Sequence, residues 1–363
     1  MADAIEIPEE ELDGYEQPKA GSWDDYPLDE LAIRDERRTT IDVVRRMQNE
    51  RFVLDPDFQR GFVWDKEKQS RLIESILMRI PLPVFYVAED NQGKLIIVDG
   101  RQRLTTLRRF IEGDLKLQLT DRPELNKKVF KDLEPRMQNR VEDCQLHFYI
   151  IDRSVPERAR LDIFERVNGG EVLTRQQMRN AIYNGVATIF LREESEEVLF
   201  IEATGGSLNI KKMQDREFVN RFCSFYLLDR RSYKDMDDWL ARGLKELESL
   251  TNVRRKNLRD QFRRSMRNNL SVFGKHAFRK HAAMNDPRNR LNASLFDVMS
   301  VALSKVDETV VNNAKSKVRK ILFQLMESEE FIKSITYSPN TPQQVRSRFE
   351  IALPKFAGLF NVA

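Results

Sequence analysis

The sequence predicts an α+β protein in which a small domain of mixed strands and helices precedes a helical bundle. Two runs rich in β-branched and aromatic residues, 84–88 and 94–98, flank Asn91-Gln92-Gly93, a pattern typical of a hairpin. After residue 154, apolar residues recur mainly at helical spacing. With 363 residues, of which 40% are hydrophobic, the chain is long enough for two domains of ordinary size.

Residues 1–36 are predicted to form a disordered acidic arm. They contain thirteen Asp and Glu residues against Lys19 and Arg34, and their apolar residues show little periodicity. A solubilising tail explains this composition. An arm that folds onto a basic surface of the same chain, and competes there with DNA, explains it as well.

Residues 37–153 are predicted to form the mixed domain. Pro56 and Gly61 break regular structure, so that residues 55–64 are expected to be a loop. Asp65 then caps a helix whose apolar stripe ends before Pro81. The predicted hairpin follows this helix.

The second hairpin strand runs through Asp99-Gly100 directly into a helix that begins with Arg101-Gln102-Arg103. Gly100 lets the backbone approach a ligand closely, and the N–H groups at a helix N-terminus favour an anion. Arg101 and Arg103 would add fork-shaped donors. The turn is therefore predicted to bind phosphate, although a simple strand-turn-helix with surface arginines would have the same residues.

Several motifs, in this order along the chain, resemble the DGQQR-type, ParB/sulfiredoxin-like domain at the N-terminus of GmrSD-type modification-dependent restriction enzymes. The motifs are Pro56-Asp57-Phe58-Gln59-Arg60 with Trp64, residues 98–107, residues 164–170 with Leu173-Thr174, and blocks at 216–222, 273–278 and 290–292. The resemblance spans roughly residues 40 to 300. It implies a ParB/sulfiredoxin-like fold for the first domain, nucleotide binding there, and a role in defence against foreign DNA.

One position departs from the family pattern. The family usually has Gln where this chain has Arg101, whereas Asp99, Gly100, Gln102 and Arg103 match. The change replaces a side chain that can orient water by a fixed positive charge. It is expected to favour phosphate binding over hydrolysis.

The resemblance implies a nucleoside triphosphate of unidentified base, together with Mg²⁺. The implied nucleotide-binding residues are Arg60, Gly100, Arg101, Arg103, Leu104, Trp64 and Asn168. The implied catalytic residues are Asp99, Gln102, Arg103 and Gln59, and the implied metal ligands are Asp99 and Asp57. Structural roles explain several of them too: ion pairs for the arginines, a loop hydrogen bond for Gln59, burial for Trp64 and helix capping for Asn168.

Residues 154–363 are predicted to form the helical domain, with basic helices at 254–290. That stretch contains twelve Lys and Arg residues against Asp260 and Asp286, which suits contact with a DNA backbone. A solvated helix face explains it equally well, because apolar residues recur there every fourth position. The predicted DNA-contact residues are Arg255, Arg259, Arg263, Arg267, Lys275 and Arg279.

Composition argues against several other classes. The chain lacks an apolar run of about 18 residues, and its acidic start is unlike a signal peptide, so no membrane association and a cytoplasmic location are expected. Cys144 and Cys223 are too few for a disulfide framework or a zinc site. The phosphate turn also lacks the reactive cysteine of sulfiredoxin.

Three functions are compatible with these features. The first is a nucleotide-binding, NTP-hydrolysing sensor or regulatory subunit that controls a separate effector protein in a prokaryotic or phage-type restriction or antiphage defence system. No third histidine follows His276 and His281 to suggest an HNH-type cleavage domain, so a stand-alone form is expected. The alternatives are a nuclease with its site in the ParB-like domain and a non-enzymatic DNA-binding module. A homo-oligomer is compatible with each.

Overall fold

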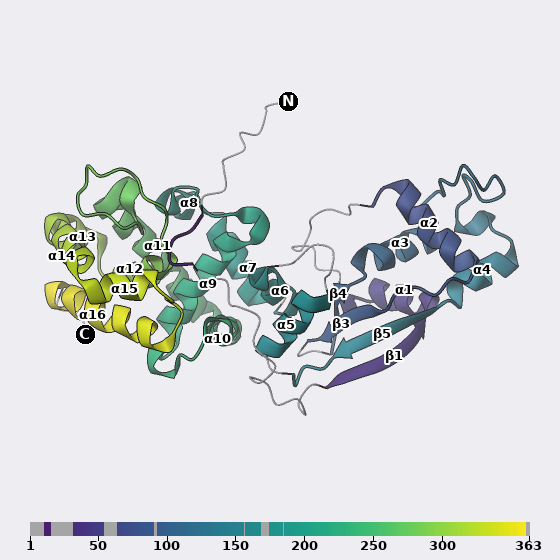
Figure 1. Ribbon diagram of the computed structural model, residues 1–363, viewed down its shortest axis with the longest axis horizontal. Coiled ribbons are helices and arrows are strands. Elements are labelled where there is room, and N and C mark those ends of the chain that lie inside the picture. The colour runs from purple at the N-terminus through teal and green to yellow at the C-terminus, as the bar shows by residue number, and fades with distance from the viewer. Residues whose placement is uncertain are drawn as a thin grey trace. The chain divides into compact units, whose positions relative to one another are not determined.

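The computed structural model describes residues 11–15, 32–53, 64–90, 93–155, 157–167, 174–183 and 185–360 (Figure 1). The chain divides into two compact units. The sheet unit lies within Ala20–Ile182, and the helical unit comprises Tyr183–Ala363 together with the N-terminal segment Met1–Lys19. None of the helices in the described ranges is long and apolar enough to cross a membrane.

The sheet unit contains a five-stranded mixed sheet in the order β1-β5-β3-β4-β2. Its strands are β1 (Ile33–Thr39), β2 (Phe52–Val53), β3 (Phe85–Glu89), β4 (Leu95–Asp99) and β5 (Gln145–Ile151). β3 pairs antiparallel with β4 and parallel with β5, while β1 pairs antiparallel with β5 and β2 parallel with β4. The sheet confirms the α+β class, and β3 and β4 confirm the predicted hairpin.

Four helices accompany this sheet and share its hydrophobic core (Figure 1). They are α1 (Thr40–Gln48), α2 (Lys66–Leu77), α3 (Arg101–Ile111) and α4 (Pro135–Glu142). Ile73 of α2, Leu104 of α3 and Phe148 of β5 are fully buried in that core. Asp65 caps α2 as the sequence predicts, with its carboxylate accepting from the Lys68 N–H at 2.7 Å.

Two further helices, α5 (Glu157–Val167) and α6 (Arg175–Ile182), belong to the sheet unit. The domain boundary predicted from the sequence lies between residues 153 and 154, where strand gives way to helix. The compact units instead separate between Ile182 and Tyr183. The guanidinium of Arg160 on α5 donates to the Glu89 carbonyl at 3.2 Å, which fastens α5 to β3.

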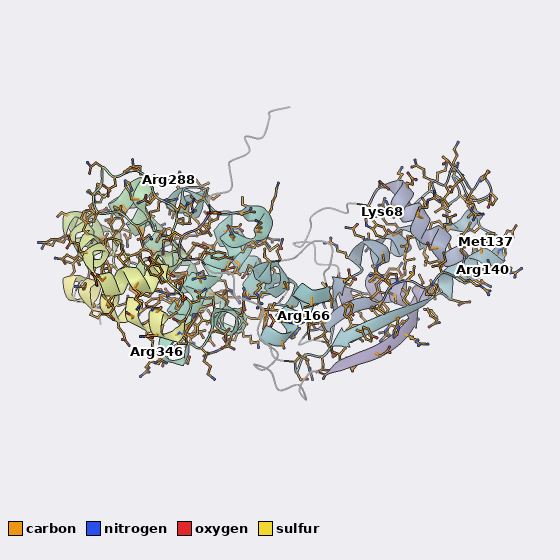
Figure 2. The ribbon with its side chains drawn as sticks, viewed as in Figure 1. Lys68, Met137, Arg140, Arg166, Arg288 and Arg346 are labelled. Carbon is orange, nitrogen blue, oxygen red and sulfur yellow. The ribbon has the colours of Figure 1, made fainter. Side chains whose placement is uncertain are left out.

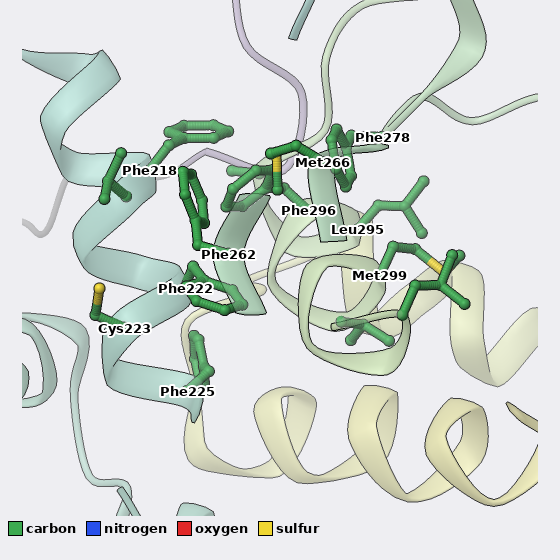
Figure 3. Packing of buried hydrophobic residues seen from close by; sticks show 14 of the residues in the cluster. Phe218, Phe222, Cys223, Phe225, Phe262, Met266, Phe278, Leu295, Phe296 and Met299 are labelled. Carbon is green, nitrogen blue, oxygen red and sulfur yellow. The ribbon is translucent and has the colours of Figure 1, made fainter. Parts of the chain in front are cut away.

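The helical unit is a bundle around α9 (Gln214–Leu227), which packs against α7, α10 and α12. The other helices are α7 (Val186–Ser195), α8 (Val198–Thr204), α10 (Met236–Ser249), α11 (Asn252–Phe273), α12 (Ala293–Ala302), α13 (Glu308–Asn313), α14 (Lys315–Glu327), α15 (Glu329–Thr336) and α16 (Pro342–Phe360). Figure 3 shows aromatic side chains of α9, α11 and α12 meeting in one core. Cys223 is fully buried there.

A buried ion network ties α9, α12 and α16 together. Arg221 donates two hydrogen bonds of 2.8 Å to the Asp297 carboxylate, and Arg348 donates a third of the same length. The side chains of Asp297 and Arg348 are 0% exposed and that of Arg221 is 1% exposed. The network therefore sits in the interior of the helical unit.

Part of the predicted disordered arm is ordered. Residues 33–36 belong to β1, and residues 11–15 form a short strap on the helical unit. The Asp13 N–H donates to the Leu291 carbonyl, and the Asp13 carbonyl accepts from the Ala293 N–H, both at 2.9 Å. The arm prediction is wrong for these residues because backbone pairing holds them. The remaining arm residues, apart from residue 32, lie outside the described ranges.

Candidate functional site

The turn between β4 and α3 depends on Gly100. Asp99, the last residue of β4, is paired with Tyr86 of β3, and Gly100 is the N-cap of α3 with φ of 99°. A Cβ atom at Gly100 would lie 2.3 Å from Cδ1 of Phe85. Both the left-handed backbone and the close approach of this ring therefore require glycine.

Arg103 fixes this turn to the segment that enters β3. Its Nη2 donates to the Asp99 carboxylate at 2.8 Å and to the Val84 carbonyl at 3.2 Å, and its Nη1 donates to the Pro83 carbonyl. The Arg103 side chain is only 12% exposed. Burial lowers the pKa of Arg103, while the Asp99 carboxylate opposes that shift. The ion pair with Asp99 is the structural role that the sequence also allows for Arg103.

The other residues of the turn differ in what they can offer a ligand. The Asp99 side chain is 39% exposed, and Arg101 and Gln102 are half-buried. Leu104 was predicted to contribute to nucleotide binding, but its side chain is 0% exposed and its N–H donates to the Gly100 carbonyl. That prediction is wrong, because both parts of Leu104 are used within the fold.

Trp64 is linked through Gln69 to Arg109, near the C-terminal end of α3 and away from the β4–α3 turn. Its carbonyl accepts from Nε2 of Gln69 at 2.9 Å, and Oε1 of Gln69 accepts from Arg109 at 3.2 Å. Arg109 is eight residues beyond Arg101, a distance of about 12 Å along an α-helix. The half-buried Trp64 packs against the core of the sheet unit, which agrees with the structural alternative of burial.

Four predicted site residues, Asp57, Gln59, Arg60 and Asn168, lie outside the described ranges. Across the described ranges, no group of three or more His, Cys, Asp or Glu side chains is placed to hold a metal ion. Of the two predicted Mg²⁺ ligands, Asp57 and Asp99, only Asp99 lies within the described ranges. Its role remains a prediction.

Acidic side chains neutralise much of the predicted DNA surface on α11. Arg259 pairs with Glu193 at 2.5 Å and with Glu194 at 2.7 Å, and Arg263 pairs with Glu194 at 2.8 Å. Arg267 likewise pairs with Glu308 at 2.5 Å. These pairs reduce the positive field that α11 presents to a phosphate backbone.

The remaining predicted DNA contacts fall into two groups. Arg279 is 1% exposed, and its guanidinium donates to the carbonyls of Thr204 and Ala277 and to the Ser207 hydroxyl. Its prediction as a DNA contact is wrong, because the side chain is used inside the bundle. Lys275 is exposed, and Arg255 is half-buried with its guanidinium on Asn252.

A buried polar cluster on α5 and α6 was not predicted from the sequence. The nearly buried members are Arg160, Asp162, Arg175, Gln176, Arg179 and Asn180. Arg175 donates to the Asp162 carboxylate at 2.6 Å, and Gln176 donates to Asn180 at 3.1 Å. One feature of the sequence could have indicated this cluster. α6 contains few apolar residues, so the face that it buries has to include polar side chains.

These features define an α+β domain in which a strand leads through a left-handed glycine directly into the helix α3. Residues 41–184 match the family described as GmrSD restriction endonuclease, N-terminal domain. The matched region runs from α1 to α6 and includes the β4–α3 turn, and over these residues it confirms the resemblance predicted from the sequence. This part of the chain is a GmrSD-type N-terminal domain.

A comparison with curated proteins found a distant relative. An uncharacterized protein of Methanocaldococcus jannaschii is 25% identical over 145 residues, which cover 32% of this chain and 25% of that protein. The match therefore spans about a quarter of the relative's length. No solved structure matches the chain.

Proposed function

We propose that this chain is a nucleotide-responsive component of a DNA restriction system, with a nucleoside triphosphate bound at the β4–α3 turn. One observation carries the proposal. Within the region that matches the GmrSD N-terminal domain, α3 begins at a glycine that makes no side-chain capping hydrogen bond. The first N–H groups of such a helix are donors for an anion.

Different groups around the turn would bind the phosphate or hold the turn in place. The backbone N–H groups and the positive end of the α3 dipole favour the phosphate oxygens. Arg101 adds a guanidinium at the first helical position. Arg103 acts as a positioning residue, because its hydrogen bonds to Asp99, Pro83 and Val84 hold the turn in place.

The turn also fits a Mg²⁺ ion carried by the nucleotide. Mg²⁺ is usually bound through one or two carboxylates together with substrate phosphates. Asp99 offers a partly exposed carboxylate next to the proposed phosphate position. When bound, the ion would neutralise phosphate charge, while Gln102 is proposed to orient water. Arg101, where the family has Gln, favours binding over turnover.

DNA and a separate effector protein are the proposed partners. The family description, a restriction endonuclease, supports DNA. Because Arg259, Arg263 and Arg267 are paired with glutamates, contacts to DNA on α11 would have to compete with these ion pairs. We therefore expect weak, salt-sensitive DNA binding by the isolated chain.

The test is to measure binding of ATP, GTP, CTP and UTP with Mg²⁺, and phosphate release with and without DNA. Asp99→Asn should weaken Mg²⁺-dependent binding roughly tenfold, since it removes a charged ligand. Arg101→Gln restores the family residue and should weaken binding while raising turnover. Arg108→Gln, on the same helix and paired with Glu112 at 3.7 Å, is the matched control.

Other outcomes would replace this proposal. Failure of the folded wild-type protein to bind any of the four nucleotides would remove the nucleotide role. DNA binding without nucleotide binding would indicate a DNA-binding module. Metal-dependent nicking of DNA, lost in Asp99→Asn, would indicate a nuclease.

A further inference from the structure

A concave site lies elsewhere in the sheet unit, between the end of α2 and α4. It is a cavity of about 550 Å³, within the usual size range of small-molecule pockets. Its lining includes the apolar residues Ile80, Pro81 and Leu82 after the end of α2, together with residues of α4 and the start of β5, most of which are polar. Figure 2 shows Arg140 on α4. Neither Asp99 nor the first turn of α3 lines this cavity.

Three arginines converge on the cavity with few partners of their own. Arg140 is held by a 3.1 Å hydrogen bond from Nη1 to the Leu77 carbonyl, and its Nε is buried without a partner. Within the described ranges, the Arg79 and Arg136 side chains make no ion pair or hydrogen bond. By contrast, Arg71 and Arg122 of the same unit both pair with Glu74.

The backbone conformation at Arg79 is one that arginine rarely adopts. The Arg79 N–H donates to the Ile76 carbonyl and the Ile80 N–H to the Ser75 carbonyl, both at 2.9 Å, which is the Schellman pattern that ends α2. Arg79 occupies its left-handed position with φ of 59°, where glycine is favoured. The chain thus places a guanidinium at the cavity in a conformation that arginine rarely adopts.

The charges identify the ligand class. Three arginines against Asp143 leave two positive charges on the cavity wall, which matches the charge of a phosphate monoester near neutral pH. We propose that this cavity binds a small organic phosphate, with the phosphate on Arg79, Arg136 and Arg140 and an apolar body against residues 80–82. This site is additional to the β4–α3 turn and does not depend on it.

Cys144 provides a local readout of occupancy. It lines the cavity and is half-buried, whereas Cys223, the other cysteine of the chain, is fully buried. Burial raises the pKa of the Cys144 thiol, so its alkylation should be slow but measurable at mildly alkaline pH. A ligand in the cavity should slow this alkylation.

The experiment uses methylanthraniloyl-AMP, a fluorescent organic phosphate whose added group is uncharged and largely apolar, and the full-length protein. Arg136→Gln should weaken binding roughly tenfold, as expected for loss of one charge-assisted hydrogen bond. Arg79→Gly should weaken binding similarly, yet raise the urea midpoint, because glycine relieves the left-handed strain. Arg45→Gln, on the exposed face of α1, should leave this binding unchanged, and Asp99→Asn, at the turn, should leave the ligand's protection of Cys144 unchanged.

Three results would overturn the proposal. The first is unchanged binding of methylanthraniloyl-AMP by the Arg79→Gly, Arg136→Gln double variant. The second is binding that fails to slow alkylation of Cys144, or that is lost in Asp99→Asn, which would assign the ligand to the β4–α3 turn. The third is protection of Cys144 by duplex DNA but not by the organic phosphate.

Discussion

The guanidinium of Arg103 lies over the ring of Phe85, with 4.3 Å between the guanidinium carbon and the ring centre. Arg103 comes from the first turn of α3 and Phe85 from the start of β3. Gly100 packs against the same ring, close enough to exclude a Cβ atom. Gly100 and Arg103 therefore both pack against Phe85, and a change at any one of these three positions should disturb the packing of the other two.

Gly100→Ala should destabilise the sheet unit severely. The alanine would have to adopt φ of 99° and would place its Cβ 2.3 Å from Phe85 Cδ1. Left-handed strain and forced repacking together should lower the free energy of unfolding by about 3 kcal/mol or more. Urea denaturation measures this change.

Gly113→Ala is the matched control, since Gly113 also has a positive φ, of 89°, but a Cβ there would have no neighbour within 4 Å. It should cost only about 1 kcal/mol, from backbone strain alone. Equal losses in the two variants would show that the Phe85 ring does not restrict Gly100.

Asp297→Asn should strongly destabilise the helical unit. The substitution removes the carboxylate that compensates Arg221 and Arg348, both of which are buried. Breaking a buried ion pair by removing one partner typically costs 3–5 kcal/mol, and we expect about that loss in the free energy of unfolding. Thermal or urea unfolding of the full chain would measure it.

Asp229→Asn tests whether burial causes the large loss of stability expected for Asp297→Asn. Asp229 also accepts hydrogen bonds from an arginine, Arg231, but both side chains are exposed. We expect little change in stability, because exposed ion pairs are screened by water and salt. A loss comparable with that of Asp297→Asn would argue against this explanation.

Local sequence signals predicted the elements of the fold well. The hairpin of β3 and β4, the Asp65 cap and the apolar stripes of the helical unit follow from turn residues and periodicity. The pairing of β1 with β5 was not predictable in this way, because it joins residues more than 100 positions apart. The attachment of residues 11–15 to Leu291 and Ala293 is similarly distant.

At the candidate site, the sequence identified the turn but not how its arginine is used. Whether Arg103 faces a ligand or the Pro83 and Val84 carbonyls depends on how β3 enters the sheet. On α11, helical spacing placed Arg259 and Arg263 on the surface. The position of Glu194, more than 60 residues earlier, is set by the packing of α7 in the folded bundle.

The stability of the helical unit should fall as the pH drops below about 6.5, partly because of His281. Its ring stacks on His276 with 4.8 Å between centres, its Nδ1 contacts the Arg279 carbonyl, and its Nε2 is buried without a partner. Burial lowers the pKa of His281 from 6.5. The Arg279 carbonyl and Asp286 oppose this shift, and the charges of His276 and Arg319 add to it.

The direction of this pH effect on stability depends on whether the folded or the unfolded state binds the proton first. With a lowered pKa in the folded state, the unfolded chain is protonated first as the pH falls, so stability is retained above 6.5 and lost below it. Urea midpoints at pH 7.5 and 5.5 should therefore differ less in His281→Phe than in the wild type. A wild-type difference between the two pH values in His281→Phe would contradict this explanation.

Two acidic side chains of the strap neutralise basic residues within 254–290, the stretch that the sequence predicted to suit contact with DNA. Glu11 pairs with Arg290 at 2.8 Å, and Asp13 pairs with Lys280 at 2.6 Å. The double variant Glu11→Gln, Asp13→Asn keeps the backbone hydrogen bonds of Asp13 but removes both charges. We expect it to bind duplex DNA a few-fold more tightly at low salt, with the gain fading as salt rises.

The control for this prediction removes two negative charges elsewhere. Glu50→Gln with Asp229→Asn changes the net charge equally at exposed positions that do not pair with residues 280–290. If both double variants gain the same affinity in a titration at low salt, the effect is one of net charge alone. If only the strap variant gains, the paired acids compete locally with DNA. No gain in either would leave the strap as a structural clamp, with its five residues stabilising the bundle through backbone pairing.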